Sequence, residues 1–253
     1  HQSLEKLNKK FKNNLKFFKG NPIDILANIC ETEKIYKIFW NRVYEPWSIQ
    51  RDKKIKDTLK VKGIDINSFN GSLLWEPWEV LKNDGTPYRV FTPYYRRGCL
   101  RAKEPRVPMN TPNKFDYYEL KKIISIDICN LNLLPKHNWK DKIIKNWKIG
   151  EDEAQERLEE FVHNELDGYK DGRNFPNRKN VSRLSPHIHW GEISPNTIWH
   201  RVWNLQELNT NKFQDTDTFL SEIGWCEFSY YLLFYFPYLP RKNLQKKFDK
   251  FSW

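Results

Sequence analysis

Residues 147–202 read WKIGEDEAQERLEEFVHNELDGYKDGRNFPNRKNVSRLSPHIHWGEISPNTIWHRV, and this stretch decides the fold class of the second half of the chain. Between 151 and 169 the apolar side chains recur at helical spacing, and acidic residues occupy the first turn, where the helix dipole favours them. Two Ser-Pro pairs, Ser185-Pro186 and Ser194-Pro195, each predict a helix start, because serine caps helices and proline suits their first turn. The second helix is expected to bury three apolar side chains: Ile198, Trp199 and Val202.

Before residue 100 the pattern alternates between helix and strand. Helical spacing and runs of strand-forming residues follow one another in the order helix, strand, helix, strand, over 22–30, 35–40, 46–62 and 64–69. Alternation of this kind is typical of a parallel α/β sheet with helices packed against it.

These patterns divide the chain into three predicted parts. Residues 101–146 are rich in Pro, Asn and Lys and predict a surface linker, while a longer helix is expected over 219–236, ended by Pro237. We therefore expect a partial α/β domain over 1–100, an interdomain linker over 101–146 and the start of an all-helical domain over 147–253.

The formal net charge of +11 does not by itself indicate a nucleic-acid partner. Residues 1–150 carry 30 basic and 16 acidic side chains, whereas residues 151–253 carry 13 and 16. Abundant Lys, Asn and Ile also arise from an A/T-rich genome, so local motifs are the better evidence.

Several function classes are not expected from the composition. No apolar run reaches the ~18 residues of a membrane span, and no secretory signal is visible, so a cytoplasmic location is expected. The four widely spaced cysteines predict reduced thiols, and His187 and His189 lie at i, i+2, so no metal site is predicted. The chain begins with His1 in place of Met, which is interpreted as a sign of a fragment or a processed chain.

Four motifs, in order along the chain, resemble the DNA photolyase and cryptochrome family. Residues 147–202 and FLSEIGWCEFSYYLLFYFPYLP (219–240) resemble the flavin domain of class I photolyases. FWNRVYEPWSIQRD (39–52) and YRVFTPYYRR (88–97) resemble the family's α/β antenna domain. The resemblance implies an internal fragment, because the family's opening strand and its second set of flavin-binding segments have no match.

The resemblance implies FAD as cofactor, with Tyr169 packed beside it. The segment that would wrap the FAD phosphates contains Val181, Ser182, Arg183, Leu184 and Ser185. Its chemistry agrees, since backbone N–H groups and hydroxyls at a helix start suit an anion. The family usually has Thr at position 181, so one hydroxyl contact is absent, and an ordinary Ser-Pro helix cap remains the alternative.

Three further residues acquire DNA roles from the resemblance. Arg173 would contact a phosphate, with an exposed surface arginine as the alternative. Glu222 and Trp225 lie on one helix face and would hydrogen-bond and stack against a flipped pyrimidine dimer, as the catalytic lesion pocket. Core packing is the alternative for Trp225. Cys226 stands where the family commonly has Arg, so one cationic contact is missing.

Two other positions concern light capture and electron supply. Trp253 matches the outermost tryptophan of the family's electron relay, with a packing role as the alternative. Members that bind folate as antenna pigment have Asn-Glu where this chain has Trp47-Ser48. Folate is therefore not expected, and the antenna pigment stays open.

The resemblance implies light-driven repair of UV-induced cyclobutane pyrimidine dimers by electron transfer from reduced FAD, in a monomer that binds UV-damaged DNA. The fragment alone is expected to be inactive, because it carries one side of the flavin site. Three alternatives stay open: a cryptochrome-type blue-light photoreceptor, a basic nucleic-acid-binding module without cofactor, and an inert gene remnant.

Overall fold

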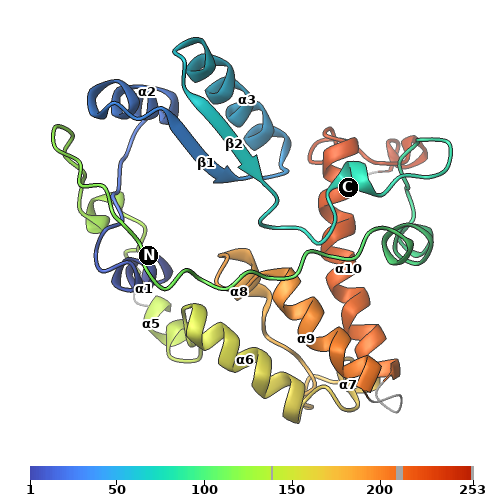
Figure 1. The fold of residues 1–253 in the computed structure, drawn as a ribbon. Coiled ribbons are helices and arrows are strands. Elements are labelled where there is room, and N and C mark those ends of the chain that lie inside the picture. Colours follow the sequence, from blue (N-terminus) through green and yellow to red (C-terminus); the bar gives the residue numbers. More distant parts are fainter. Residues whose placement is uncertain (138, 209–212, 252–253) are drawn as a thin grey trace. The chain divides into compact units, whose positions relative to one another are not determined.

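The computed structural model describes residues 1–137, 139–208 and 213–251 (Figure 1). The chain forms two compact units. The first contains residues 1–40, 54–67 and 109–194, and the second contains residues 41–53, 68–108 and 195–253. Each unit therefore combines segments from the early and the late parts of the sequence.

The predicted α/β alternation is present as α2 (Pro22–Glu33), β1 (Lys37–Asn41), α3 (Pro46–Val61) and β2 (Asp65–Phe69). The two strands pair in a two-stranded sheet, and the helix between them makes the connection of a parallel βαβ unit (Figure 1). The side chain of Asn21 caps α2 by accepting the amide of Ile23 at 3.0 Å, with Pro22 in the first turn. The expected fold class is confirmed.

A small apolar core holds α2 and α3 against the strands. Its buried members are contributed by both helices and by the residue before β2: Cys30, Ile55, Leu59 and Ile64. Ile55 and Leu59 are four residues apart and share a helix face, as the spacing predicts. Trp47, which the sequence pattern places on the apolar side of the same helix, is instead 60% exposed.

The other helices of the first unit are α1 (Gln2–Lys10), α5 (Trp139–Ile144), α6 (Glu151–Asn164), α7 (Tyr169–Gly172) and α8 (Ser185–His189), with a 3-10 turn at Ile128–Leu131. The single helix predicted over 151–169 is thus divided in two. The amides of Glu165 and Leu166 both donate to the carbonyl of Phe161, which closes α6. Gly168 then adopts a left-handed φ of 75°, a conformation that favours glycine.

Much of the predicted linker is exposed, and Glu33 at the end of α2 anchors it. The Glu33 carboxylate accepts the amides of Lys121, Lys122 and Ile123 at 3.2, 2.7 and 3.0 Å. The hydroxyl of Tyr118 donates to the same carboxylate at 3.2 Å. One acidic side chain therefore satisfies three consecutive backbone amides of a segment that has few other regular contacts.

The second unit is built on α9 (Pro195–Leu208) and α10 (Phe213–Tyr235), which pack against each other (orange to red in Figure 1). As predicted, α9 buries Ile198, Trp199 and Val202, and α10 ends before Pro237. Two short turns pack beside α10, η1 (Pro77–Glu79) and the π turn η2 (Tyr94–Gly98). The short helix α4 (Phe91–Pro93) and the turn η3 (Cys99–Arg101) pack against η2, and η6 (Lys246–Phe248) follows α10. No helix in the described part of the chain is long and apolar enough to cross a membrane.

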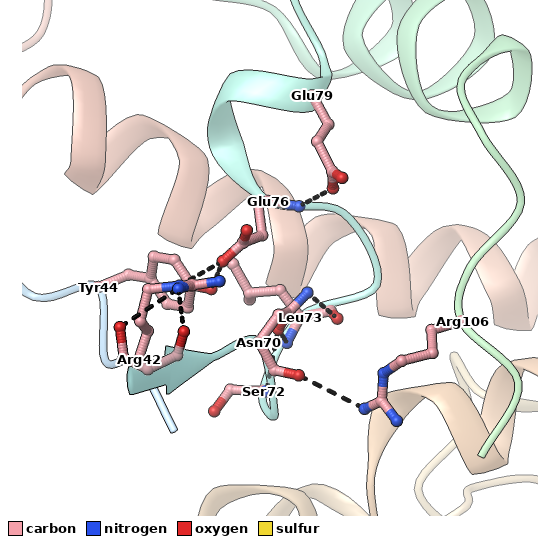
Figure 2. A network of polar contacts seen from close by, with 9 residues as sticks. Arg42, Tyr44, Asn70, Ser72, Leu73, Glu76, Glu79 and Arg106 are labelled. Atoms are coloured by element: carbon pink, nitrogen blue, oxygen red, sulfur yellow. Dashed lines mark hydrogen bonds and ion pairs between the residues drawn. The ribbon is translucent and has the colours of Figure 1, made fainter. Parts of the chain in front are cut away.

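A polar network holds residues 70–79 in the second unit (Figure 2). Glu76 Oε1 accepts Arg42 Nε at 2.6 Å and the Tyr44 hydroxyl at 2.7 Å, and the amide of Glu76 donates to Glu79. Burial raises the pKa of Tyr44, so its hydroxyl stays protonated and donates. Asn70 accepts the amide of Leu73 at 2.9 Å. Hydrogen bonds therefore fix the chain between β2 and the end of η1 at several points.

Candidate functional site

Residues 181–185 form a turn that Arg157 of α6 holds in place. Arg157 Nε donates to the carbonyl of Ser182 at 2.8 Å, and Nη2 donates to the carbonyl of Val181 at 3.1 Å. The amide of Leu184 donates to Ser182 Oγ at 3.4 Å, and Arg183 has a left-handed φ of 53°. Arg157 thus occupies the carbonyl oxygens of the turn, while Val181 and Arg183 remain exposed.

The predicted helix start at Ser185 is confirmed, because α8 begins there, and Ser185 is exposed. Leu184, and not a serine, occupies the N-cap, and no side chain caps the helix. With only five residues α8 has a small dipole, so anion binding here depends on side chains and local amides.

Tyr169 is 7% exposed and lies against α6. Its ring meets the edge of Phe161 at 5.6 Å between centroids, and the Arg173 guanidinium lies 5.4 Å from the Tyr169 centroid. Tyr169 and Arg173 are therefore neighbours, one turn apart, as their spacing predicts. A cation over a tyrosine face contributes roughly 0.5–1 kcal/mol at an exposed site.

Asn180 ties the segment after α7 to the residues just before that helix. Its Nδ2 donates to the carbonyls of Glu165 and Asp167 at 2.9 and 2.8 Å. It also lies so close to Gly172 that a Cβ there would come within 2.2 Å of Asn180 Oδ1. The two predicted segments around Tyr169 and Ser182 are thus packed together through Asn180.

His187 is buried beside Glu192, and its contacts belong to the packing of the helices around it. Glu192 Oε2 lies 2.6 Å from His187 Nδ1, while Glu192 Oε1 accepts the amide of Gly150 at 2.9 Å and the Ser3 hydroxyl. Glu192 therefore joins α8 to the start of α6 and to α1. Among the described residues no group of His, Cys, Asp and Glu side chains is arranged to hold a metal ion.

In the second unit, Trp225 belongs to a stack of three aromatic rings. The Trp225 and Phe91 rings stack at 3.7 Å between centroids and 13° between planes, and Phe91 stacks on Tyr95 at 5.5 Å and 10°. Tyr95 is buried and wedged against Gly224, where a Cβ would come within 2.6 Å of its ring. Trp225 is 44% exposed, so it has an available surface although Phe91 covers one face.

Glu222 and Ser229 flank Trp225 on α10. Glu222 is half-buried, whereas the Ser229 hydroxyl donates to the carbonyl of Trp225 at 2.9 Å and is used within the helix. Cys226 is exposed as a residue, but partial desolvation of its sulfur raises the pKa of the thiol, so it stays neutral near pH 7. A thiol cannot supply the positive charge that the resemblance leads one to expect from Arg at this position. The polar group of the predicted lesion pocket is therefore Glu222.

Glu227, on the buried side of α10, holds the loop of Figure 2. Its Oε2 accepts the amides of Leu74 and Trp75 at 3.0 and 3.3 Å. Burial raises the pKa of this carboxyl to about 8, although the two amides lower it. No basic side chain is among its contacts in the described structure. Burial thus favours the protonated form of Glu227, and its carboxyl group fixes α10 against residues 74–75.

The predicted residues fall into two groups that the structure describes separately. Glu222 and Trp225 lie together in the second unit, and Tyr169, Arg173 and 181–185 lie together in the first. Trp253 lies outside the described residues. Sequence reasoning missed Phe91, Arg157 and Glu227. Only Phe91 had a signal, since it stands inside the quoted stretch YRVFTPYYRR.

Comparisons with known proteins identify the family of the chain. The model of the family described as DNA photolyase matches residues 1–113. A deoxyribodipyrimidine photo-lyase of Agrobacterium fabrum is 37% identical over 92% of this chain and 48% of its own length. Cryptochrome-1 of Arabidopsis thaliana is 31% identical over 90% of this chain and 34% of its own length.

A solved structure has a similar fold. The bacterial class III photolyase from Agrobacterium tumefaciens superposes with a TM-score of 0.91 and 36% identity, covering 100% of this chain and 52% of that one. The chain belongs to the DNA photolyase and cryptochrome family. It spans about half the length of the photo-lyases it matches. The class I assignment stays a prediction.

Proposed function

We propose that the full-length protein repairs UV-induced cyclobutane pyrimidine dimers by light-driven electron transfer from reduced FAD, as a deoxyribodipyrimidine photo-lyase. The single observation that carries this proposal is the half-exposed indole of Trp225, held by Phe91 and Tyr95 beside the carboxyl group of Glu222. A flipped base needs an aromatic wall and a polar edge, and this helix face supplies both.

FAD fits the residues of the turn at 181–185. Its pyrophosphate is anionic, and the exposed Arg183 with the hydroxyls of Ser182 and Ser185 supplies a cation and two donors. Tyr169 of α7 would pack beside the cofactor. When bound and reduced, FAD would supply the electron that light makes available. The protein would bind and orient the cofactor and the lesion, and would exclude water from them.

Different residues of the chain would contact different parts of the DNA. Trp225 stacks on the flipped dimer with the surface that Phe91 leaves open, and Glu222 hydrogen-bonds the polar edge of the base. Arg173 contacts a backbone phosphate and so positions the DNA without reading sequence. Trp253, as the outermost relay residue, passes an electron inward to recharge oxidised FAD.

The test is repair by the full-length protein. An irradiated thymidine oligonucleotide is incubated with flavin-reduced protein in blue light, and dimer loss is followed by chromatography. We expect light-dependent restoration of the bases, reduced in Trp225→Ala. Light-dependent flavin signals without any loss of dimers would contradict repair.

That second result would support the main alternative, a blue-light photoreceptor. The observation that favours it is the 31% identity with a plant cryptochrome over 90% of the chain. Lesion-dependent turnover separates the two functions, because a photoreceptor does not need it.

The same proposal includes the organisation of the protein. We assign residues 1–100 to a partial antenna domain, 101–146 to a linker and 147–253 to the first part of the FAD domain. The protein would act as a cytoplasmic monomer without a metal ion, which size-exclusion chromatography and elemental analysis of the full-length protein test. The antenna pigment stays open.

A further inference from the structure

An open basic groove lies in the second unit, and none of the predicted site residues lines it. It has a volume of about 860 Å³. Its lining includes four cationic side chains, one acid and one tyrosine: Lys82, Arg89, Arg97, Arg101, Asp84 and Tyr88. Small-molecule pockets are usually enclosed and carry few charges, whereas this groove is open and lined by several cationic side chains.

Two of its arginines carry charge that no other group in the described structure neutralises. Arg97 and Arg101 are exposed, four residues apart, and neither has a hydrogen-bond or ion-pair partner there. The neighbouring Arg96 behaves differently, since it forms a bidentate pair with Asp217 at 2.6 Å for both contacts. The unpaired charges therefore gather on the groove side of this turn.

The backbone beneath these arginines is rigid. Tyr94, Tyr95 and Cys99 are buried, which anchors the π turn and the 3-10 turn that follows it. At Gly98 a Cβ would come within 2.6 Å of Val80, so the turn packs tightly on the loop before it. The guanidinium groups are thus presented from a fixed base, which lowers the entropy lost on binding.

The groove continues into the aromatic stack through α4. Val90 and Pro93 line the groove, and Phe91 between them stacks on Trp225. Asp84 is the one opposing charge, and hydrogen bonds from the hydroxyl and amide of Thr86 lower its pKa. Four cations therefore face a single carboxylate beside the proposed base-stacking surface.

We propose that this groove binds the phosphate backbone of DNA next to the flipped lesion, through Arg97 and Arg101 together with Lys82 and Arg89. The proposal rests on the DNA-directed function above and adds a second, sequence-independent surface to it. Phosphate contacts by arginine position a strand and release counterions, so they control the salt dependence of binding more than the choice of lesion.

The test measures binding of UV-irradiated and undamaged duplex DNA by fluorescence anisotropy over a salt series. For Arg97→Ala/Arg101→Ala we expect both duplexes to bind roughly 10- to 30-fold more weakly at about 0.15 M salt, with the log–log slope smaller by about 2. The ratio of the two affinities should stay unchanged. Arg97→Lys/Arg101→Lys, which keeps the charges, should retain most of the slope.

The control Lys54→Ala/Lys60→Ala removes two exposed charges from α3, outside the groove. Equal salt-dependence slopes for the wild type and the arginine variant would overturn the proposal that the groove binds DNA. An equal loss of DNA affinity in the lysine control would do the same. Neither result would contradict the proposed lesion pocket. Loss of the affinity ratio in Trp225→Ala alone would then still support the proposed function. Failure of the wild-type protein to bind either duplex would overturn both.

Discussion

Glu227 gives the sharpest prediction, because its buried carboxyl should make the stability of the protein depend on pH. The side chain is 3% exposed, accepts two backbone amides and has no cation among its described contacts. Raising its pKa from 4.5 to about 8 corresponds to about 5 kcal/mol of preference for the protonated form, at 1.36 kcal/mol for each pH unit.

The sign follows from proton linkage. Between pH 4.5 and about 8 the folded protein keeps the proton of Glu227, whereas the unfolded chain loses it. The stabilisation is therefore complete below pH 4.5 and is lost as pH rises towards 8. In Glu227→Gln, which resembles the protonated acid in shape, this contribution to the slope disappears.

Between pH 5.5 and 7.5 we expect the free energy of unfolding of the wild-type protein to fall by roughly 3 kcal/mol more than that of Glu227→Gln. The reason is that a proton held only by the folded state changes this free energy by about 1.4 kcal/mol per pH unit in this window. Urea unfolding at each pH measures the difference, and Glu222→Gln, a half-buried carboxyl on the same helix, is the control. Parallel curves for wild type and Glu227→Gln would refute the reasoning and indicate that Glu227 is ionised in the folded protein.

Three other predictions concern single contacts. Trp225→Ala should lower the ratio of damaged to undamaged DNA affinity roughly 5- to 150-fold, the equivalent of one base stack of about 1–3 kcal/mol; equal losses on both DNAs would argue for packing alone. Phe91→Leu should lower the same ratio by removing the ring that orients Trp225, and Phe91→Tyr should restore it. Glu33→Gln should speed hydrogen exchange at Lys121, Lys122 and Ile123. In wild type the protection of these amides, taken relative to the intrinsic exchange rate at each pH, should fall as acid protonates Glu33, whose pKa is lowered chiefly by the Lys122 amide. Unchanged protection would mean that the carboxylate does not hold the segment.

The elements that sequence predicts well are those with a local cause. The start of α2 follows from Asn21 and Pro22, and the buried face of α9 follows from the spacing of Ile198, Trp199 and Val202. The division of the helix predicted over 151–169 was missed, because one apolar repeat runs across the break. The left-handed Gly168 that makes the break is a single residue within that repeat.

In the candidate site, too, some features have a local cause in the sequence and others depend on tertiary contacts. Glu222 and Trp225 share a helix face by their spacing alone, so sequence places them together without any tertiary knowledge. What makes the pair usable is non-local: Phe91 and Tyr95 orient the indole from more than a hundred residues away in sequence, and Glu227 anchors α10 to residues 74–75. Glu227 also shows why such residues escape a reading of sequence. Three polar or aromatic residues, Trp225, Cys226 and Glu227, follow one another, and only the packing around α10 decides which one is buried. That burial sets the protonation of Glu227. The pH dependence of the free energy of unfolding, compared between the wild type and Glu227→Gln, therefore tests a tertiary contact that no sequence motif predicts.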